Sequence, residues 1–169
     1  EVTPVWVDVE EDVEVNFEDG EGDICSIEED VWVSPNGDDY LNTGTSPANA
    51  FLTIETALEL IAPSENNIIT INLTEGIFSP STTGETFSII MISNVNIIGQ
   101  GEEMTILDSE QTGGVIIMEN CENNIISDMT ITGGLSSDGS AIKINESNLQ
   151  ILNCLIDNNK AYVRAAIEI

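Results

Sequence analysis

The chain has 169 residues, with 31 acidic side chains against three basic ones and no histidine, which gives a formal net charge of −28. A potential of that sign repels nucleic acids and anionic membranes, so we expect neither as a partner. No run of about 20 apolar residues is present, so membrane insertion is not expected either. Aromatic residues make up only 5% of the chain, so the core must consist of Ile, Val and Leu, which suits stacked β-strands.

Residues 1–30 form an acidic leader. Apolar and polar residues alternate in two stretches of it, and a period of two predicts two β-strands. An isolated pair of strands is marginal in water, so their apolar faces need a sheet to join. That sheet could belong to this chain, to an upstream domain or to a neighbouring molecule. The apolar members of the two strands are Val5, Val7, Val9, Val13, Val15 and Phe17.

An acidic turn at residues 19–23 is similar to a calcium-binding loop. In the helix–loop–helix Ca²⁺ pattern, however, Phe17 would have to be the first ligand, and a phenyl ring cannot coordinate the ion. We therefore expect an acidic turn rather than a formed site, and no cofactor. The alternative is bound Ca²⁺, because hard oxygen ligands are abundant. The candidate ligands are Asp19, Glu21, Asp23, Asp38 and Asp39.

The predicted solenoid domain, residues 31–169, begins with a short strand at residues 31–34. Apolar residues then keep helical spacing over about residues 51–61, and Pro63 ends the pattern, which predicts one amphipathic helix. Ser46–Pro47 or Asn49 could cap its start. Because the end of a stack of coils exposes core and unpaired backbone, we expect this helix to cover the first coil.

From residue 68 onward the chain consists of short β-branched runs separated by Asn and Gly, and similar runs recur about every 25 residues. A period in the twenties is typical of a solenoid, in which each coil stacks on the one before. We predict an all-β fold in which Ile106, Ile131 and Ile156 form a vertical file in the interior. The recurring positions are Thr105–Leu107, Thr130–Thr132 and Leu155–Asp157; Ile116, Ile142 and Ile167; and Ile97, Ile126 and Ile151.

Several motifs between residues 31 and 169 resemble those of a known superfamily. VWVSPNGD at 31–38, GTSP at 44–47 and FLTI at 51–54 resemble the N-terminal cap of secreted parallel β-helix proteins. EGIF at 75–78 looks like the turn of a first coil, and residues 95–108 look like the coil that follows. In order and spacing these motifs are similar to the pectate-lyase-like superfamily, which implies a right-handed parallel β-helix with about 25 residues per coil. Many relatives are bacterial surface or secreted proteins, which implies an extracellular or cell-surface location.

That fold hosts polysaccharide lyases, hydrolases, adhesins, tailspikes and structural stalks, so the resemblance alone does not give the function. Lyases of this fold place an Arg or Lys base beside an acidic sugar, but Lys143, Lys160 and Arg164 are the only cations, and we expect them at the rim of the coils. Hydrolases of this fold resemble one another in an Asp cluster with a Gly-His-Gly turn, and this chain lacks His. For the same reason no Ser–His or Cys–His pair can form. We therefore expect no catalytic site.

Asparagine is frequent where corners between strands are expected. Asn tolerates a left-handed backbone and can stack as a hydrogen-bonded ladder, so we expect a structural role, with a flat polar row for glycan binding as the alternative. Cys25, Cys121 and Cys154 are too few for a disulfide scaffold. The corner residues are Asn120, Asn123, Asn124, Asn145, Asn148, Asn153, Asn158 and Asn159.

The last five residues, 165–169, repeat the pattern of residues 140–144, with no C-terminal cap after them. A coil that stops there leaves an open sheet edge. We expect it to be covered by further coils of a longer chain or by a neighbouring molecule, end to end, through contacts of Ile167 and Ile169 with the leader strands.

These observations predict a non-catalytic extracellular β-solenoid, a structural or adhesive module of a surface protein or a self-assembling fibre. Its partners would be further coils, copies of itself or neutral glycans. The alternative is the N-terminal part of a polysaccharide-binding or polysaccharide-degrading β-helix enzyme whose site lies beyond residue 169.

Overall fold

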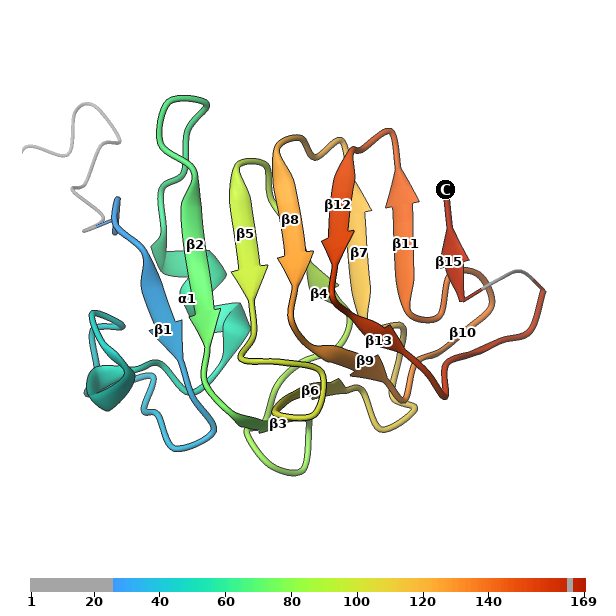
Figure 1. Ribbon diagram of the computed structural model, residues 1–169, viewed down its shortest axis with the longest axis horizontal. Helices are drawn as coiled ribbons and strands as arrows, with labels where there is room; N and C mark the ends of the chain where they lie inside the picture. The colour runs from blue at the N-terminus through green and yellow to red at the C-terminus, as the bar shows by residue number, and fades with distance from the viewer. Residues whose placement is uncertain (1–25, 164–165) are drawn as a thin grey trace, which may run out of the picture.

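The computed structural model describes residues 26–163 and 166–169. They form a parallel β-solenoid of about four coils, spaced about 26 residues apart, with one short α-helix near its N-terminal end (Figure 1). The predicted all-β solenoid is therefore confirmed. The leader strands and the acidic turn at 19–23 lie outside the described residues.

Three parallel sheets run along the axis of the solenoid and together enclose a continuous apolar interior. The front sheet faces the viewer in Figure 1, and each of its strands pairs with the corresponding strand of the next coil. Its members are β1 (Val31–Val33), β2 (Ile69–Leu73), β5 (Val95–Ile98), β8 (Asn124–Ser127) and β12 (Leu149–Leu152).

The other two sheets complete the coils below and behind the front sheet (Figure 1). The lower one consists of β3 (Gly76–Phe78), β6 (Thr105–Asp108), β9 (Thr130–Thr132) and β13 (Leu155–Ile156). The rear one consists of β4 (Ile89–Ile90), β7 (Ile116–Glu119), β11 (Ile142–Asn145) and β15 (Ile167–Glu168). A short pair, β10 (Leu135–Ser136) with β14 (Lys160–Ala161), extends the last two coils.

Alternation along each strand sends every second side chain inward, and stacking aligns these residues into files. Two predicted files are confirmed by the pairing register. They are Ile97, Ile126 and Ile151 in the front sheet, and Ile116, Ile142 and Ile167 in the rear sheet.

The predicted position of Ile106 in the lower sheet is wrong by one residue. Leu107, not Ile106, pairs with Ile131, which in turn pairs with Ile156. Leu107 is fully buried, whereas Ile106 is half-buried and lies beside Ile77 on the outer side. The coil from Leu107 to Ile131 has 24 residues, one fewer than the coil from Ile131 to Ile156. A shift of one residue moves a side chain to the opposite face of a sheet.

The single helix α1 (Ile54–Leu60) is confirmed and is shorter than predicted. Neither Asn49 nor Ser46–Pro47 caps it, because Pro47–Asn49 form a separate 3-10 turn, η1. The N-cap is Thr53, whose hydroxyl accepts the N–H of Thr56. Ile54 and Ala57 turn inward and are fully buried, so the helix closes the interior at this end of the stack.

Several corners use Asn with a positive φ, as predicted. The φ angles of Asn94, Asn120, Asn123, Asn153 and Asn158 lie between 51° and 63°, a left-handed backbone that Asn tolerates better than most residues. The Asn side chains also link coils: Asn123 donates to the side chain of Asn94 at 2.8 Å and its N–H donates to that of Asn148 at 3.1 Å. These bonds hold the corners of three successive coils in line.

Candidate functional site: the uncharged front sheet

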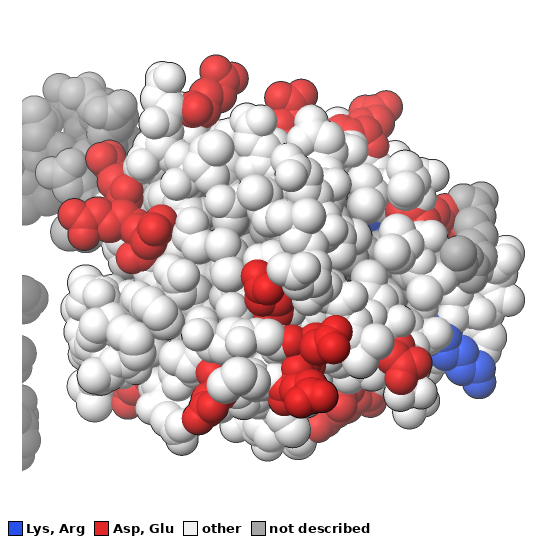
Figure 2. Space-filling model, viewed as in Figure 1, with Lys and Arg blue, Asp and Glu red and all other residues white. Residues whose placement is uncertain are grey.

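The front sheet differs from the rest of the surface in its charge. None of its five strands contains Asp, Glu, Lys or Arg, although the chain has 34 such residues. Figure 2 shows the same face: its centre, over β2, β5 and β8, carries no charged side chains, and the acidic residues gather at the ends of the strands. In so acidic a protein this is a surface that an uncharged partner could cover without removing charged side chains from water, which is costly.

The outer side of the front sheet carries two files of side chains. Neighbouring members of a file are about 4.8 Å apart because they belong to adjacent hydrogen-bonded strands, so five strands span about 19 Å. Amide, hydroxyl and apolar groups are mixed along both files, and most of these side chains are half-buried. The first file is Thr70, Asn96, Ile125 and Gln150, and the second is Trp32, Asn72, Ile98, Ser127 and Leu152.

An amide-lined pocket of about 200 Å³ lies along one edge of this face. Its floor is formed by Asn96, Ile125 and Gln150, and Asn123 and Asn148 come from the corner. The Oδ1 atom of Asn96 accepts the N–H of Ile125 at 3.0 Å, which fixes the orientation of that amide. Amide groups both donate and accept hydrogen bonds, so the pocket suits hydroxyl or amide groups of a neutral ligand.

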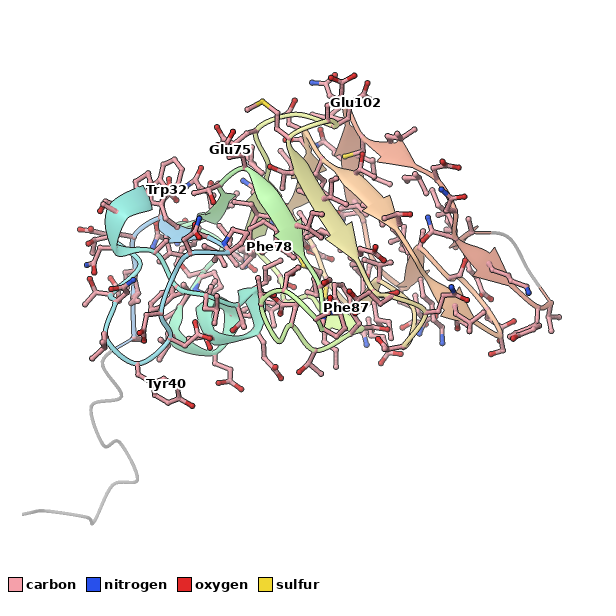
Figure 3. The ribbon with its side chains drawn as sticks, turned by 90° about the horizontal axis from the view of Figure 1, so that it is seen from below. Trp32, Tyr40, Glu75, Phe78, Phe87 and Glu102 are labelled. Atoms are coloured by element: carbon pink, nitrogen blue, oxygen red, sulfur yellow. The ribbon has the colours of Figure 1, made fainter. Side chains whose placement is uncertain are left out.

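A second pocket, of about 280 Å³, lies at the opposite ends of the strands, beside the indole of Trp32. Met104 and Pro47 supply further apolar contacts and Gln100 a side-chain amide. Figure 3 shows Trp32 and Glu75 on the same side of the solenoid, whereas Phe78 points into the interior and Tyr40 projects from the opposite side. A half-exposed indole offers a flat apolar surface and an N–H donor together.

The predicted metal candidates Asp38 and Asp39 have local hydrogen-bonding roles. Asp38 accepts the N–H groups of Tyr40 and Leu41 at 2.8 and 3.0 Å, which forms a turn. Asp39 accepts the N–H groups of Leu52 and Thr53 at 2.7 and 3.1 Å and the hydroxyl of Thr53 at 2.9 Å. Asp39 therefore anchors the segment that leads into α1.

Two glutamates also accept hydrogen bonds that anchor other segments, and neither was predicted from the sequence. Glu85 is almost fully buried and accepts the N–H groups of Ile54 and Glu55 at 2.7 and 3.1 Å. Burial raises the pKa of Glu85 to about 7, against the lowering effect of these two bonds. Glu110 accepts bonds from the hydroxyls of Ser81 and Ser79, and these bonds hold its pKa below the usual value. These four carboxylates thus accept hydrogen bonds from the backbone or from neighbouring loops.

The expected rim cations are placed in part. Lys143 pairs in register with Ile117 and Glu168 on the rear sheet, as predicted, and Lys160 is exposed with its ammonium 5.7 Å from the ring of Tyr162. Arg164 lies outside the described residues. Cys121 and Cys154 carry free thiols, and burial raises the pKa of Cys154.

Within residues 26–163 and 166–169 no group of three or more potential metal ligands is found, and no helix is long and apolar enough to cross a membrane. Asp19, Glu21 and Asp23 lie outside this part of the chain. Of the predicted assembly residues, Ile167 pairs with Ile142 and packs on the core, and Ile169 is 95% exposed.

Comparison of the chain with protein-family models, with curated proteins and with solved structures found no match. The class of protein is therefore defined by the geometry of the chain itself, which is that of a parallel β-solenoid.

Proposed function

We propose that this chain is a non-catalytic β-solenoid module of an extracellular surface protein or fibre, and that its front sheet is an adhesive face for a neutral polysaccharide. The observation that carries the proposal is the absence of charge from all five strands of that sheet. A neutral glycan presents many hydroxyls and apolar ring faces, which match the amide pocket and the indole of Trp32. Kinship with the pectate-lyase-like superfamily is part of the proposal.

The experiment measures retardation of the full chain in native gels that contain a neutral galactomannan or a neutral xyloglucan, with polygalacturonate as the anionic comparison. Retardation by a neutral polymer, and none by polygalacturonate, is expected. Gln150→Glu places a charge in the amide pocket and should abolish the retardation. Gln111→Glu makes the same change at another exposed position, so it should leave the retardation unaltered. Absence of retardation by both neutral polymers, or equal effects of the two variants, would contradict the adhesive role.

The same face would also serve the alternative, a polysaccharide-degrading enzyme of which this chain is the binding part. The same polymers, incubated with the chain and Ca²⁺, separate the two functions through the appearance of new reducing ends. We expect none from this chain. Polymer cleavage that survives purification would replace the non-catalytic proposal by the enzymatic one.

The last coil supports the structural half of the proposal. In the part of the chain that the structure describes, β12, β13 and β15 each pair with a strand on one side only. Their inward residues Ile151 and Ile156 are half-buried, whereas Ile126 and Ile131 in the coil before are fully buried. Open strand edges over apolar side chains recruit another strand layer. We propose that further coils, of the same chain or of a neighbouring copy, cover this coil.

Sedimentation velocity over a hundredfold range of concentration tests coverage by a neighbouring copy. The full chain is compared with a chain that lacks residues 1–25, and electron microscopy checks for fibres. The truncation stops there because Ile27 pairs with Ile61 and Asp30 accepts the N–H of Thr70 at 2.7 Å. A sedimentation coefficient that rises with concentration for the full chain, but not for the truncated chain, supports strand addition by the leader. Monomers in both cases at every concentration would exclude assembly of copies.

A further inference from the structure

A second groove lies away from the front sheet, between α1 and the rear strand β4. It has a volume of about 320 Å³ and mostly apolar walls, formed by Leu58 from the helix and by Ile89, Ile90 and Ile92 from β4 and the residues after it. Ile90 is 66% exposed, an unusual position for an isoleucine. In Figure 3, α1 and the segment that carries Phe87 lie side by side on the face opposite Trp32.

The rim and the floor of this groove are acidic. Glu55 and Glu59 are one helical turn apart on α1, so they form a row along the groove, and both are exposed. Glu85 lies at the floor, where its two oxygens accept the first N–H groups of the helix. No Lys or Arg lines the groove, and every cation of the chain lies at residue 143 or beyond.

The groove also contains the outer edge of a β-sheet. Ile89 and Met91 donate their N–H groups to Val115 and Ile117 of the next coil, both at 2.9 Å. Because successive N–H groups of a strand point to opposite sides, the N–H and C=O of Ile90 point away from β7, on the unpaired side of β4. Among the described residues no hydrogen bond joins Ser88–Ile92 to α1, and β4 is the edge strand of its sheet.

We propose that this groove binds an extended peptide of a partner protein that alternates apolar residues with Lys or Arg. The peptide would add to the edge of β4, which is a recurring mode of peptide recognition. Its apolar side chains would cover Ile90 and Leu58. Its basic side chains would point to the other face of the added strand and place their charges at Glu55 and Glu59. The acidic leader of this chain has the wrong charge for the groove, which favours a separate, basic partner.

The probe is the fluorescein-labelled peptide acetyl-SIRIRIS-amide, and fluorescence anisotropy measures its binding to the full chain. Saturable binding is expected, with none for acetyl-SIEIEIS-amide. The double variant Glu55→Gln/Glu59→Gln should weaken binding by roughly tenfold or more, since it removes both charge partners at the rim. The matched control Glu102→Gln/Glu103→Gln removes two exposed acids on another corner and should weaken it less than twofold.

Two further variants test the apolar wall and the strand edge. Ile90→Ser should weaken binding, whereas Ile77→Ser, at another exposed isoleucine, should not. A peptide with alternate N-methyl groups cannot pair with β4 and should lose binding. No binding of SIRIRIS, equal losses in the two double variants, or full binding of the N-methylated peptide would each overturn the proposal. None of these measurements involves the front sheet, so the result is independent of the glycan proposal.

Discussion

The two ends of the solenoid differ in how the outermost strands and the apolar interior are covered. At the first end the outer edge of β1 is covered: Trp32 donates its N–H to Gly44 and accepts that of Phe51. Phe51 and Ile54 then close the interior and are almost completely buried. At the other end, Ile151 and Ile156 face the interior with no layer above them among the described residues, and both stay half-buried.

The difference shows that a coil depends on its neighbours on both sides. The interior positions of the middle coils are sealed by the layer before and the layer after, so their burial is complete. Stability in such a stack is approximately a sum of terms for each coil and for each interface between coils. A residue in the last coil therefore stabilises the fold through one interface, and the same residue in a middle coil through two.

The largest effect should come from the same truncation at two levels of one file. Ile131→Ala removes a fully buried side chain and should lower the free energy of unfolding by about 3–4 kcal/mol, because the cavity cannot collapse between two layers. Ile156→Ala, one coil further, should cost about 1 kcal/mol, since its side chain is already partly exposed. Urea unfolding measures both. Equal losses would mean that the last coil is as well packed as the middle ones.

The second effect concerns the covered end and its dependence on pH. The pKa of Glu85 is raised to about 7 in the folded state, above the ordinary value of 4.5, so the folded state favours the neutral carboxyl. The contribution of Glu85 to the free energy of unfolding is complete below pH 4.5. It falls as the pH rises to about 7 and is then lost, a change of up to about 3 kcal/mol. Glu85→Gln should remove this part of the pH dependence, whereas Glu119→Gln, at an exposed position, should not. Identical pH profiles of unfolding for Glu85→Gln and the unaltered chain would contradict the assignment.

A third test compares the two neighbouring aspartates at the covered end. Asp39→Ala removes the acceptor of three hydrogen bonds to Leu52 and Thr53 and should cost about 2 kcal/mol. Asp38→Ala loosens only an exposed turn and should cost about 0.5 kcal/mol. Thermal unfolding monitored by circular dichroism distinguishes them. A larger loss at Asp38 would show that the covered end does not depend on Asp39.

A fourth test concerns the register of the lower sheet. Ile106→Ala should cost about 1 kcal/mol or less because Ile106 points outward, whereas Leu107→Ala should cost about 3 kcal/mol. Urea unfolding of the two variants gives the comparison. A larger loss for Ile106→Ala than for Leu107→Ala would show that Ile106, not Leu107, faces the interior.

Much of the fold could be predicted from the sequence because the spacing of β-branched residues reports directly on stacked coils. Ile116, Ile142 and Ile167 lie in register as their spacing predicted. The register of the lower sheet could not be predicted, since it depends on the combined length of the corners between Leu107 and Ile131. The start of α1 was also predicted wrongly: Thr53 caps it, and the other acceptor of its first N–H groups, the carboxylate of Glu85, lies about thirty residues away in the chain.

The candidate site was predictable only in outline. The sequence indicated polar rows and a partner without negative charge, but it did not show which strands share a face. Once β2, β5 and β8 are known to lie side by side, the absence of charged residues from the front sheet is evident from the sequence. The groove beside β4 has no such signal, because it depends on how a helix lies against a strand from the next coil.

The unequal corners have a consequence for how this chain can be lengthened or shortened. Ile97 and its stacked neighbour Ile126 are 29 residues apart, whereas Leu107 and Ile131 are 24 apart, yet both pairs stack in the same way. The corners therefore absorb differences of several residues, and foreign loops or epitopes should be accepted there without disturbing the coils. A single residue inserted within a strand should not be tolerated, since it would move every following side chain of that strand to the opposite face of the sheet.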